Sequence, residues 1–194
     1  MSDGWDDVRA RLARRTDRLL ADLREEWGTS RTAEPFEYGP KPWYPDAAPE
    51  SVDEQLGALA GLASVVVCDT RNRREAVLVY NRAGYWEPPG GAVEGRDSLA
   101  DTAVREAREE TGLSVELTGL LSAGRVRHRY GDGRAVPLPV ATFVGRRVDG
   151  SLRVEREVND HPGVTRGVGL FGPDVLPDRC RDRDLVEAAL DGDG

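Results

Sequence analysis

The chain has 194 residues, of which 39% are hydrophobic and 32% charged, enough for one polar globular domain with an appendage. Its net charge of −8 argues against general nucleic-acid binding, because phosphate neutralisation needs a basic surface. Cys68 and Cys180 form no CxxC pattern, which argues against a zinc site or a disulfide framework and favours reduced thiols in the cytoplasm. We expect no membrane span and no export signal.

The first fifty residues divide into a helix and an arm. Residues from about Asp3 to Trp27 are predicted to form one helix, because apolar residues recur at helical spacing and Gly28 follows as a stop. Docking or dimerisation is its simplest role. Residues 29–50 contain five prolines and are predicted to be loop-like, with their aromatic side chains packed on the domain. Substrate stacking by Trp43 or Tyr44 is the alternative.

The next segment mixes a helix with strands. A short helix is predicted at Val52 to Leu59. The β-branched run Val65 to Val67 and the apolar run Ala76 to Tyr80, joined by a charged turn, predict a hairpin. Residues Trp86 to Gly91 are predicted to form a loop rich in proline and glycine.

The second half of the chain completes an α+β pattern. It begins with a predicted helix at Ser98 to Thr111 and ends with one at about Arg181 to Leu190. Four strands are predicted between them, at Ser114 to Arg129, Leu138 to Val148, Leu152 to Val158 and Val168 to Phe171. Strands on both sides of one central helix, without a regular βαβ rhythm, predict an α+β sandwich. We therefore divide the chain into an N-terminal helix and arm, residues 1–50, and a main domain, residues 51–194.

The central helix carries strong local signals. Ser98 is a candidate N-cap, and Asp101 three residues later completes a capping box. Gly112 is placed to supply the left-handed residue at the C-terminus. Small and apolar residues stepping by four from Leu99 to Ala107 are expected to face a sheet.

Three carboxylates on this helix form the candidate site. Glu106, Glu109 and Glu110 lie at i, i+3 and i+4, so they share one face and repel by a few tenths of a kcal/mol per pair. A divalent cation such as Mg²⁺ would offset that repulsion and could bridge the acidic chain to a phosphorylated molecule. The upstream Gly90-Gly91 pair allows close backbone approach, so a carbonyl there is a further candidate ligand. Arg105 can pair with Glu109.

The 23 positions from Gly91 to Leu113 resemble the Nudix box, and Trp86 to Gly91 resembles the approach that precedes it. The resemblance covers roughly residues 60–178. Two positions depart from the pattern: Asp97 stands where the family has glutamate, and Arg96 stands where a glycine is frequent.

The resemblance implies a fold and a metal site. The implied fold is a Nudix-type α/β/α sandwich with a mixed central sheet, here with an N-terminal helical extension. Glu109 and Glu110 would bind Mg²⁺, with Mn²⁺ as the alternative, and Glu106 would be a third ligand or a base. Gly90 would offer its carbonyl, and Arg105 would orient the carboxylates.

Substrate contacts and the base are less specific. By the same resemblance, Trp86, Gly91 and Tyr130 are candidate substrate contacts, although a hairpin-tip tyrosine is also ordinary structure. The general base is Glu106 or an acid in a later loop, for which Glu155 and Glu157 are candidates. His128 and His161 lack a partner motif, so we expect them to be polar surface residues.

The implied activity is Mg²⁺-dependent cleavage of the diphosphate bond in a nucleoside diphosphate linked to another moiety, such as a dinucleoside polyphosphate or a nucleotide sugar. Water would attack a phosphorus of the P–O–P bridge. A catalytically weak nucleotide-binding regulatory module is the alternative. An isoprenoid diphosphate isomerase would need a pocket cysteine, which neither Cys68 nor Cys180 is placed to supply. A homodimer is a further expectation.

Overall fold

The computed structural model describes residues 3–28, 30–41, 44–69, 75–94, 97–154 and 165–192, but not the side chains of Asp3 and Asp69. The helices are α1 (Asp3–Trp27), α2 (Val52–Ala58), α3 (Leu99–Thr111) and α4 (Arg183–Asp191), with the 3-10 turn η2 (Pro173–Val175) before α4. The strands are β1 (Arg31–Thr32), β2 (Phe36–Tyr38), β3 (Leu62–Asp69), β4 (Glu75–Asn81), β5 (Trp86–Glu87), β6 (Gly90–Ala92), β7 (Leu113–Arg129), β8 (Ala135–Gly150) and β9 (Thr165–Phe171).

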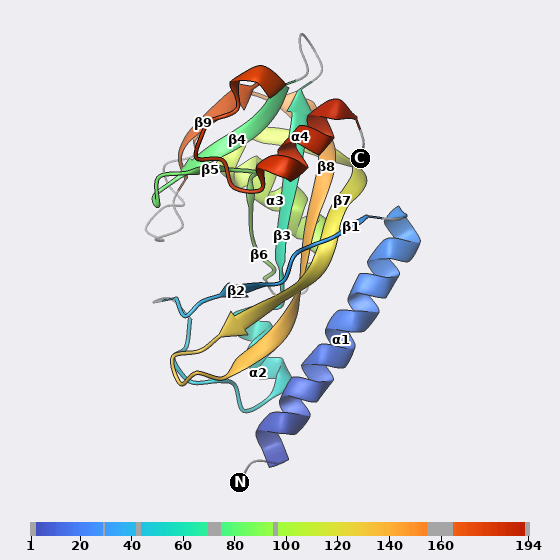
Figure 1. The fold of residues 1–194 in the computed structure, drawn as a ribbon, viewed down its shortest axis with the longest axis vertical. Coiled ribbons are helices and arrows are strands. Elements are labelled where there is room, and N and C mark those ends of the chain that lie inside the picture. The colour runs from blue at the N-terminus through green and yellow to red at the C-terminus, as the bar shows by residue number, and fades with distance from the viewer. Residues whose placement is uncertain are drawn as a thin grey trace.

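The strands form one mixed sheet. The order is β1-β7-β8-β3-β4-β5, with β2 beside β7, β6 beside β3 and β9 beside β4 (Figure 1). Strands β7 and β8 make a long antiparallel hairpin, whereas β3 runs parallel to β8 and antiparallel to β4. The predicted α+β class is confirmed, and so is the hairpin of β3 and β4. The segment Trp86 to Gly91, predicted as a loop, instead contains β5 and the start of β6.

Helices cover both faces of this sheet. Val65 and Val67 of β3 are fully buried in the same cluster as Ala103 of α3. Val66, between them, is buried in a second cluster with Val186 of α4. Successive strand side chains point to opposite faces, so α3 and α4 lie on opposite sides of β3 (Figure 1). The predicted α/β/α sandwich is confirmed.

The ends of α3 are fixed by local hydrogen bonds. The Ser98 hydroxyl accepts from the Asp101 amide at 3.0 Å, and the Asp101 carboxylate accepts from the Ser98 amide at 3.2 Å. Gly112 ends the helix with a φ of 74°, in the left-handed region. Ala103 and Ala107 are fully buried against the sheet. The predicted capping box and stop are confirmed, and they set the helical phase of the carboxylates.

Helix α1 lies along the β7–β8 hairpin (Figure 1). Its Leu12 is 1% exposed. The Thr16 hydroxyl donates to the carbonyl of Pro137 at 3.1 Å, and the Arg24 guanidinium donates to the carbonyl of Ala123 at 3.1 Å. The predicted helix is confirmed in its bounds, and its apolar stripe is buried against the sheet domain.

The proline-rich arm contains two short strands that the loop prediction missed. Strands β1 and β2 run parallel to β7, with Phe36 opposite Val126 in the register. Pro35 and Pro40 flank β2 closely, which keeps it short because proline cannot donate to a ladder. Tyr44 packs with its ring 6.0 Å from that of Tyr38, whereas Trp43 lies outside the described residues.

His128 is not a surface residue, which corrects the sequence-based expectation. Alternate residues are buried at this end of β7, and His128 is 1% exposed. Its ring centroid lies 5.9 Å from Tyr38, 5.2 Å from Tyr44 and 4.7 Å from Tyr130. Burial lowers its pKa below the usual range. His161 lies outside the described residues.

The strand predicted at Leu152 to Val158 is wrong over its described part. Residues 152–154 form no strand, and residues 155–158 lie outside the described ranges. The Arg153 amide donates to the carbonyl of Thr111 at 2.9 Å, and Leu152 packs against the core cluster of α3. Residues 152–154 therefore fold back on the end of α3 instead of pairing with the sheet.

If α1 belongs to the cooperative core, Leu12→Ala should lower the free energy of unfolding by about 2–5 kcal/mol, because it leaves a cavity against the sheet. Arg9→Ala, at an exposed position of the same helix, should change it by no more than about 0.5 kcal/mol. Urea unfolding monitored by tryptophan fluorescence measures both. A separate early transition for α1, with an unchanged main transition, would contradict this expectation.

Candidate active site

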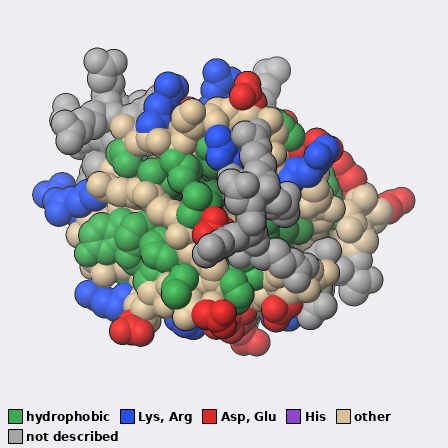
Figure 2. Space-filling model, turned by 90° about the horizontal axis from the view of Figure 1, so that it is seen from above, with side chains coloured by type: hydrophobic (Ala, Val, Ile, Leu, Met, Phe, Trp, Pro, Cys, Tyr) green, Lys and Arg blue, Asp and Glu red, His purple; other side chains and the backbone are tan. Residues whose placement is uncertain are grey.

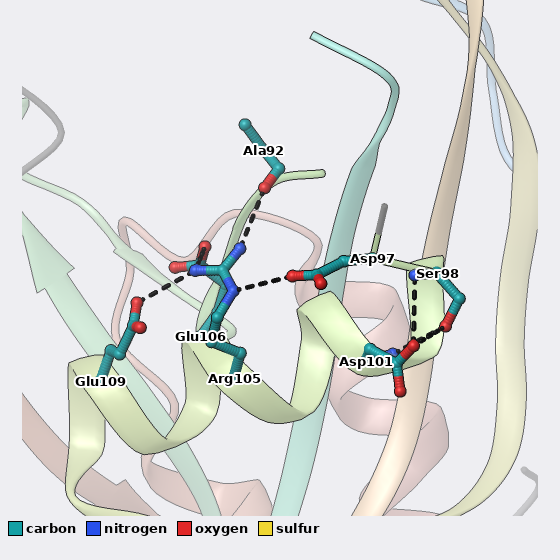
Figure 3. Close-up of polar contacts among 7 residues, drawn as sticks. All are labelled: Ala92, Asp97, Ser98, Asp101, Arg105, Glu106 and Glu109. Atoms are coloured by element: carbon teal, nitrogen blue, oxygen red, sulfur yellow. Dashed lines mark hydrogen bonds and ion pairs between the residues drawn. The ribbon is translucent and has the colours of Figure 1, made fainter. Parts of the chain in front are cut away.

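Arg105 is the centre of the acidic site on α3. Its Nη1 atom lies 2.9 Å from Glu106 Oε1 and 3.0 Å from Glu109 Oε2, and its Nε atom lies 3.3 Å from Asp97 Oδ2 (Figure 3). Its Nη2 atom donates to the carbonyl of Ala92 at 3.3 Å. The predicted Arg105–Glu109 pair is present. One guanidinium thus contacts three carboxylates and ties α3 to β6.

Glu110 points to a different set of partners. Its carboxylate accepts from the Gly90 amide at 2.9 Å and from the hydroxyl of Thr165 on β9. Burial raises its pKa to about 8, against the opposing effect of the Thr165 and Gly90 hydrogen bonds. The nearby charges of Glu106 and Glu87 raise it further. Burial also raises the pKa of Glu106, and the adjacent Arg105 charge opposes that rise.

The double glycine of β6 is required by close contacts on both sides. A Cβ atom on Gly91 would lie 2.5 Å from the Glu106 carboxyl group, and one on Gly90 would lie 2.6 Å from the carbonyl oxygen of Ala63. Gly90 and Gly91 pair with Ser64 and Ala63 of β3. Only glycine lets this backbone lie between β3 and the acidic face of α3. The Gly90 amide donates a hydrogen bond to Glu110, and the role of the Gly90 carbonyl as a metal ligand stays a prediction.

Trp86 is placed in an aromatic group at the β5 edge. Its ring centroid lies 5.2 Å from that of Tyr80 and 4.7 Å from that of Phe171. Its amide donates to the Arg179 carbonyl at 2.8 Å, and its carbonyl accepts from the Arg181 amide at 2.8 Å. The face of the molecule seen from above carries a group of apolar side chains with charged side chains around it (Figure 2). Substrate contact by Trp86 stays a prediction.

Tyr130 lies apart from the acidic helix, near the far end of the β7–β8 hairpin. It is 4% exposed, in a core cluster formed with α1 and α2. Its hydroxyl donates to the Gln55 side chain, which in turn donates to the carbonyl of Leu59 at 2.7 Å. The ring has little free surface for stacking a base, and substrate contact by Tyr130 stays a prediction.

Two contacts of the site were missed by the sequence reasoning. Thr165 lies 55 residues from Glu110, and no local pattern connects them. Glu87 accepts from the Asn81 amide group at 2.6 Å and pairs with Arg181 at 3.2 Å, and burial raises its pKa. Glu87 lies in the segment that leads to the double glycine, and this position could have indicated that it belongs to the site. The candidates Glu155 and Glu157, and the departure at Arg96, lie outside the described residues.

The carboxylates of Glu106, Glu109 and Glu110 do not converge on one point, as we had expected them to do. Within the described ranges no group of three or more His, Cys, Asp or Glu side chains is arranged to hold a metal ion. Arg105 holds Glu106 and Glu109, while Glu110 turns to Gly90 and Thr165. The donors themselves fit a hard divalent cation, since they are carboxylate oxygens on one helical face. To hold such a cation, the carboxylates would have to rearrange around Arg105.

The described residues contain no helix long and apolar enough to cross a membrane.

Comparison with known proteins identifies a family match. The family model described as NUDIX domain matches residues 61–184. This range begins just before β3 and ends at the start of α4, so it includes the sheet from β3 onward and all of α3.

Three relatives match shorter segments. Mouse nucleoside diphosphate-linked moiety X motif 6 is 35% identical over 88 residues, which cover 44% of this chain and 26% of that protein. The CMP-5'-(N-acetyl-N-hydroxy-3-aminopropyl)phosphonate hydrolase of Streptomyces rubellomurinus is 41% identical over 69 residues, 32% of each chain. The 8-oxo-dGTP diphosphatase of Proteus vulgaris is 32% identical over 74 residues, 37% of this chain and 64% of that one. The match thus spans less than two thirds of each relative.

A solved structure shares the fold. The NUDIX-family hydrolase from Clostridium perfringens superposes with a TM-score of 0.51 at 16% identity, covering 70% of this chain and 98% of that chain.

The raised pKa of Glu110 predicts a pH-dependent stability. In the metal-free protein the folded state keeps a proton on Glu110 up to about pH 8, whereas the unfolded chain, with the ordinary value of 4.5, has lost it. The folded state then binds more protons, so its stability falls as pH rises from about 5 to about 8, by ~1.4 kcal/mol per pH unit from this group. Glu110→Gln should remove this fall, measured by urea unfolding at several pH values with chelator present.

Thr165→Val provides the matched variant. It removes a hydroxyl that lowers the Glu110 pKa, so the fall in stability should extend to higher pH. An identical pH slope in the parent protein and Glu110→Gln would show that Glu110 is ionised in the folded protein throughout this range.

Proposed function

Because the chain belongs to the Nudix family, we propose that it is a metal-dependent hydrolase that cleaves the diphosphate bond of a nucleoside diphosphate linked to another moiety. The arrangement of residues around α3 supports this proposal. Glu106, Glu109 and Glu110 lie on one helical face, and the backbone of Gly90 and Gly91 lies directly against it. A solvated surface helix would not need a glycine backbone fitted against its carboxylates.

The chain's own residues supply a metal-binding set and its support. Glu106, Glu109 and Glu110, with the carbonyl of Gly90, would hold Mg²⁺, or Mn²⁺ in its place. The ion would neutralise charge on the phosphate oxygens and lower the pKa of water. Arg105 positions Glu106 and Glu109 through its two pairs at 2.9 and 3.0 Å.

Three neighbouring groups complete the proposed roles. Thr165 and the Gly90 amide orient Glu110 through their hydrogen bonds. Asp97 stands one methylene short of the glutamate that the family pattern has, yet it reaches Arg105 at 3.3 Å. The departure at this position therefore leaves the support of Arg105 in place. The general base is Glu106 or an acid of the segment that contains Glu155 and Glu157.

The proposed substrate class is supported by the relatives that the chain matches. The names of the three relatives all refer to nucleotides or their derivatives. A dinucleoside polyphosphate and a nucleotide sugar are the two candidates that we favour. Cys68 and Cys180 are both in the thiol form, which is compatible with the cytoplasm. A homodimer is a further proposal.

Glu110→Gln should lower kcat/KM by at least about a hundredfold, because it removes a charge that the metal and the transition state require. The assay follows nucleotide release from a panel of nucleoside-diphosphate derivatives with Mg²⁺, and chelator should abolish the release. Glu116→Gln on β7, where Glu116 pairs with Arg146 at 2.5 Å, should retain activity within about twofold.

Tight binding of a panel member without turnover in the parent protein would contradict hydrolysis and favour a regulatory nucleotide-binding module. Turnover that survives chelator would contradict the metal.

A further inference from the structure

The middle of α1 carries an unusual concentration of arginine. Residues 9–18 contain five arginines and one acid, in a chain whose net charge is −8. The acid, Asp17, is paired with Arg125 of β7. Positive charge is therefore concentrated in the middle of a helix whose ends are acidic, and this concentration is not explained by the composition of the chain.

Four of these arginines share one face. Arg11, Arg14, Arg15 and Arg18 follow the spacing i, i+3, i+4 and i+7, which puts them on one side of α1 over a rise of ~10 Å. Together with Val52 of α2 they line a depression of about 420 Å³. The depression is largely open to solvent.

The protein itself gives these arginines few partners. Arg11 lies 3.9 Å from Asp7, and both side chains are more than half exposed, so this pair contributes little. Across the described residues, no ion pair or hydrogen bond involves the guanidinium groups of Arg14, Arg15 and Arg18. Arg24 of the same helix, by contrast, is bound to the carbonyl of Ala123.

The position of Arg15 makes the absence of a partner costly. It is half-buried, and burial lowers the pKa of its guanidinium. Four like charges on one face also repel one another. An anion in the depression would relieve both costs, because guanidinium groups bind phosphate oxygens by paired, charge-assisted hydrogen bonds.

We propose that the face formed by Arg11, Arg14, Arg15 and Arg18 binds a small molecule with a chain of several phosphates, at a site separate from the acidic face of α3. The four arginines start from backbone positions spread over a rise of ~10 Å, so a chain of several phosphates would contact more of them at once than a single phosphate group would. The acidic ends of α1 and the net charge of −8 disfavour a long nucleic-acid strand. The proposal does not depend on hydrolysis at α3.

The test is a calorimetric titration of metal-free protein with sodium tripolyphosphate, and in parallel with ATP, at 0.15 M salt. Without divalent metal, the acidic face of α3 repels both probes. The double variant Arg14→Gln/Arg18→Gln should raise the Kd by at least about tenfold, the effect of losing one or more charge-assisted hydrogen bonds. The matched control Arg9→Gln/Arg82→Gln removes the same charge from exposed positions outside the depression and should stay within about twofold.

Two further variants make the result decisive. Glu110→Gln should bind tripolyphosphate like the parent protein, which separates this site from α3. If the glutamine pair lowers the thermal midpoint, Arg14→Lys/Arg18→Lys keeps the charge and should still weaken binding, because an ammonium group cannot bind phosphate in a bidentate way.

The ATP arm identifies the source of the phosphates. If ATP binds more tightly than tripolyphosphate, the site also recognises the nucleoside. If the two bind equally, the site recognises the phosphate chain alone. The proposal is overturned if the parent protein shows no saturable binding, or if both glutamine pairs weaken it equally. Loss of binding in Glu110→Gln, or a preference for a single-stranded oligonucleotide, overturns it as well.

Discussion

The pairing of Arg105 with the carboxylates of α3 is the interaction on which the candidate site depends. Glu106 and Glu109 would repel at their helical spacing, and a single guanidinium nitrogen lies 2.9 and 3.0 Å from them. The same side chain reaches Asp97 and the carbonyl of Ala92, so it fixes α3 against the segment before it. Arg105 keeps an acidic cluster compact, and it also sets the geometry that a metal would have to rearrange.

The sheet supplies the other half of the site. Strand β6 pairs with β3, and this pairing directs the Gly90 amide toward Glu110. It also places Gly91 in close contact with the Glu106 carboxyl group. Thr165 reaches Glu110 from β9, on the other side of β4. Three chain segments that are distant in sequence therefore meet at one carboxylate. Its burial, and with it the raised pKa, is a property of the tertiary fold and not of the helix.

The sequence predicted most reliably what depends on neighbouring residues. The caps at Ser98 and Gly112 act within one helical turn, and the Arg105–Glu109 pair follows from i+4 spacing, so each was predictable. The strands β1 and β2 are too short to carry a periodic signal, and their pairing with β7 is long-range. Of the strand predicted at Leu152 to Val158, the described residues 152–154 form none, because the Arg153 amide bonds to the end of α3. The turning of Glu110 toward Thr165 could not be predicted, because no local pattern relates them.

We propose that the carboxylates of α3 bind a divalent cation beside the double glycine. Crystals of the protein grown with Mn²⁺ and a non-hydrolysable nucleoside diphosphate test it most directly, through the anomalous scattering of manganese. We predict a peak ~2.0–2.4 Å from carboxylate oxygens of Glu106, Glu109 and Glu110, with Arg105 shifted from at least one of its present partners. Bound nucleotide with no anomalous peak there, and with both Arg105 pairs intact, would contradict the account.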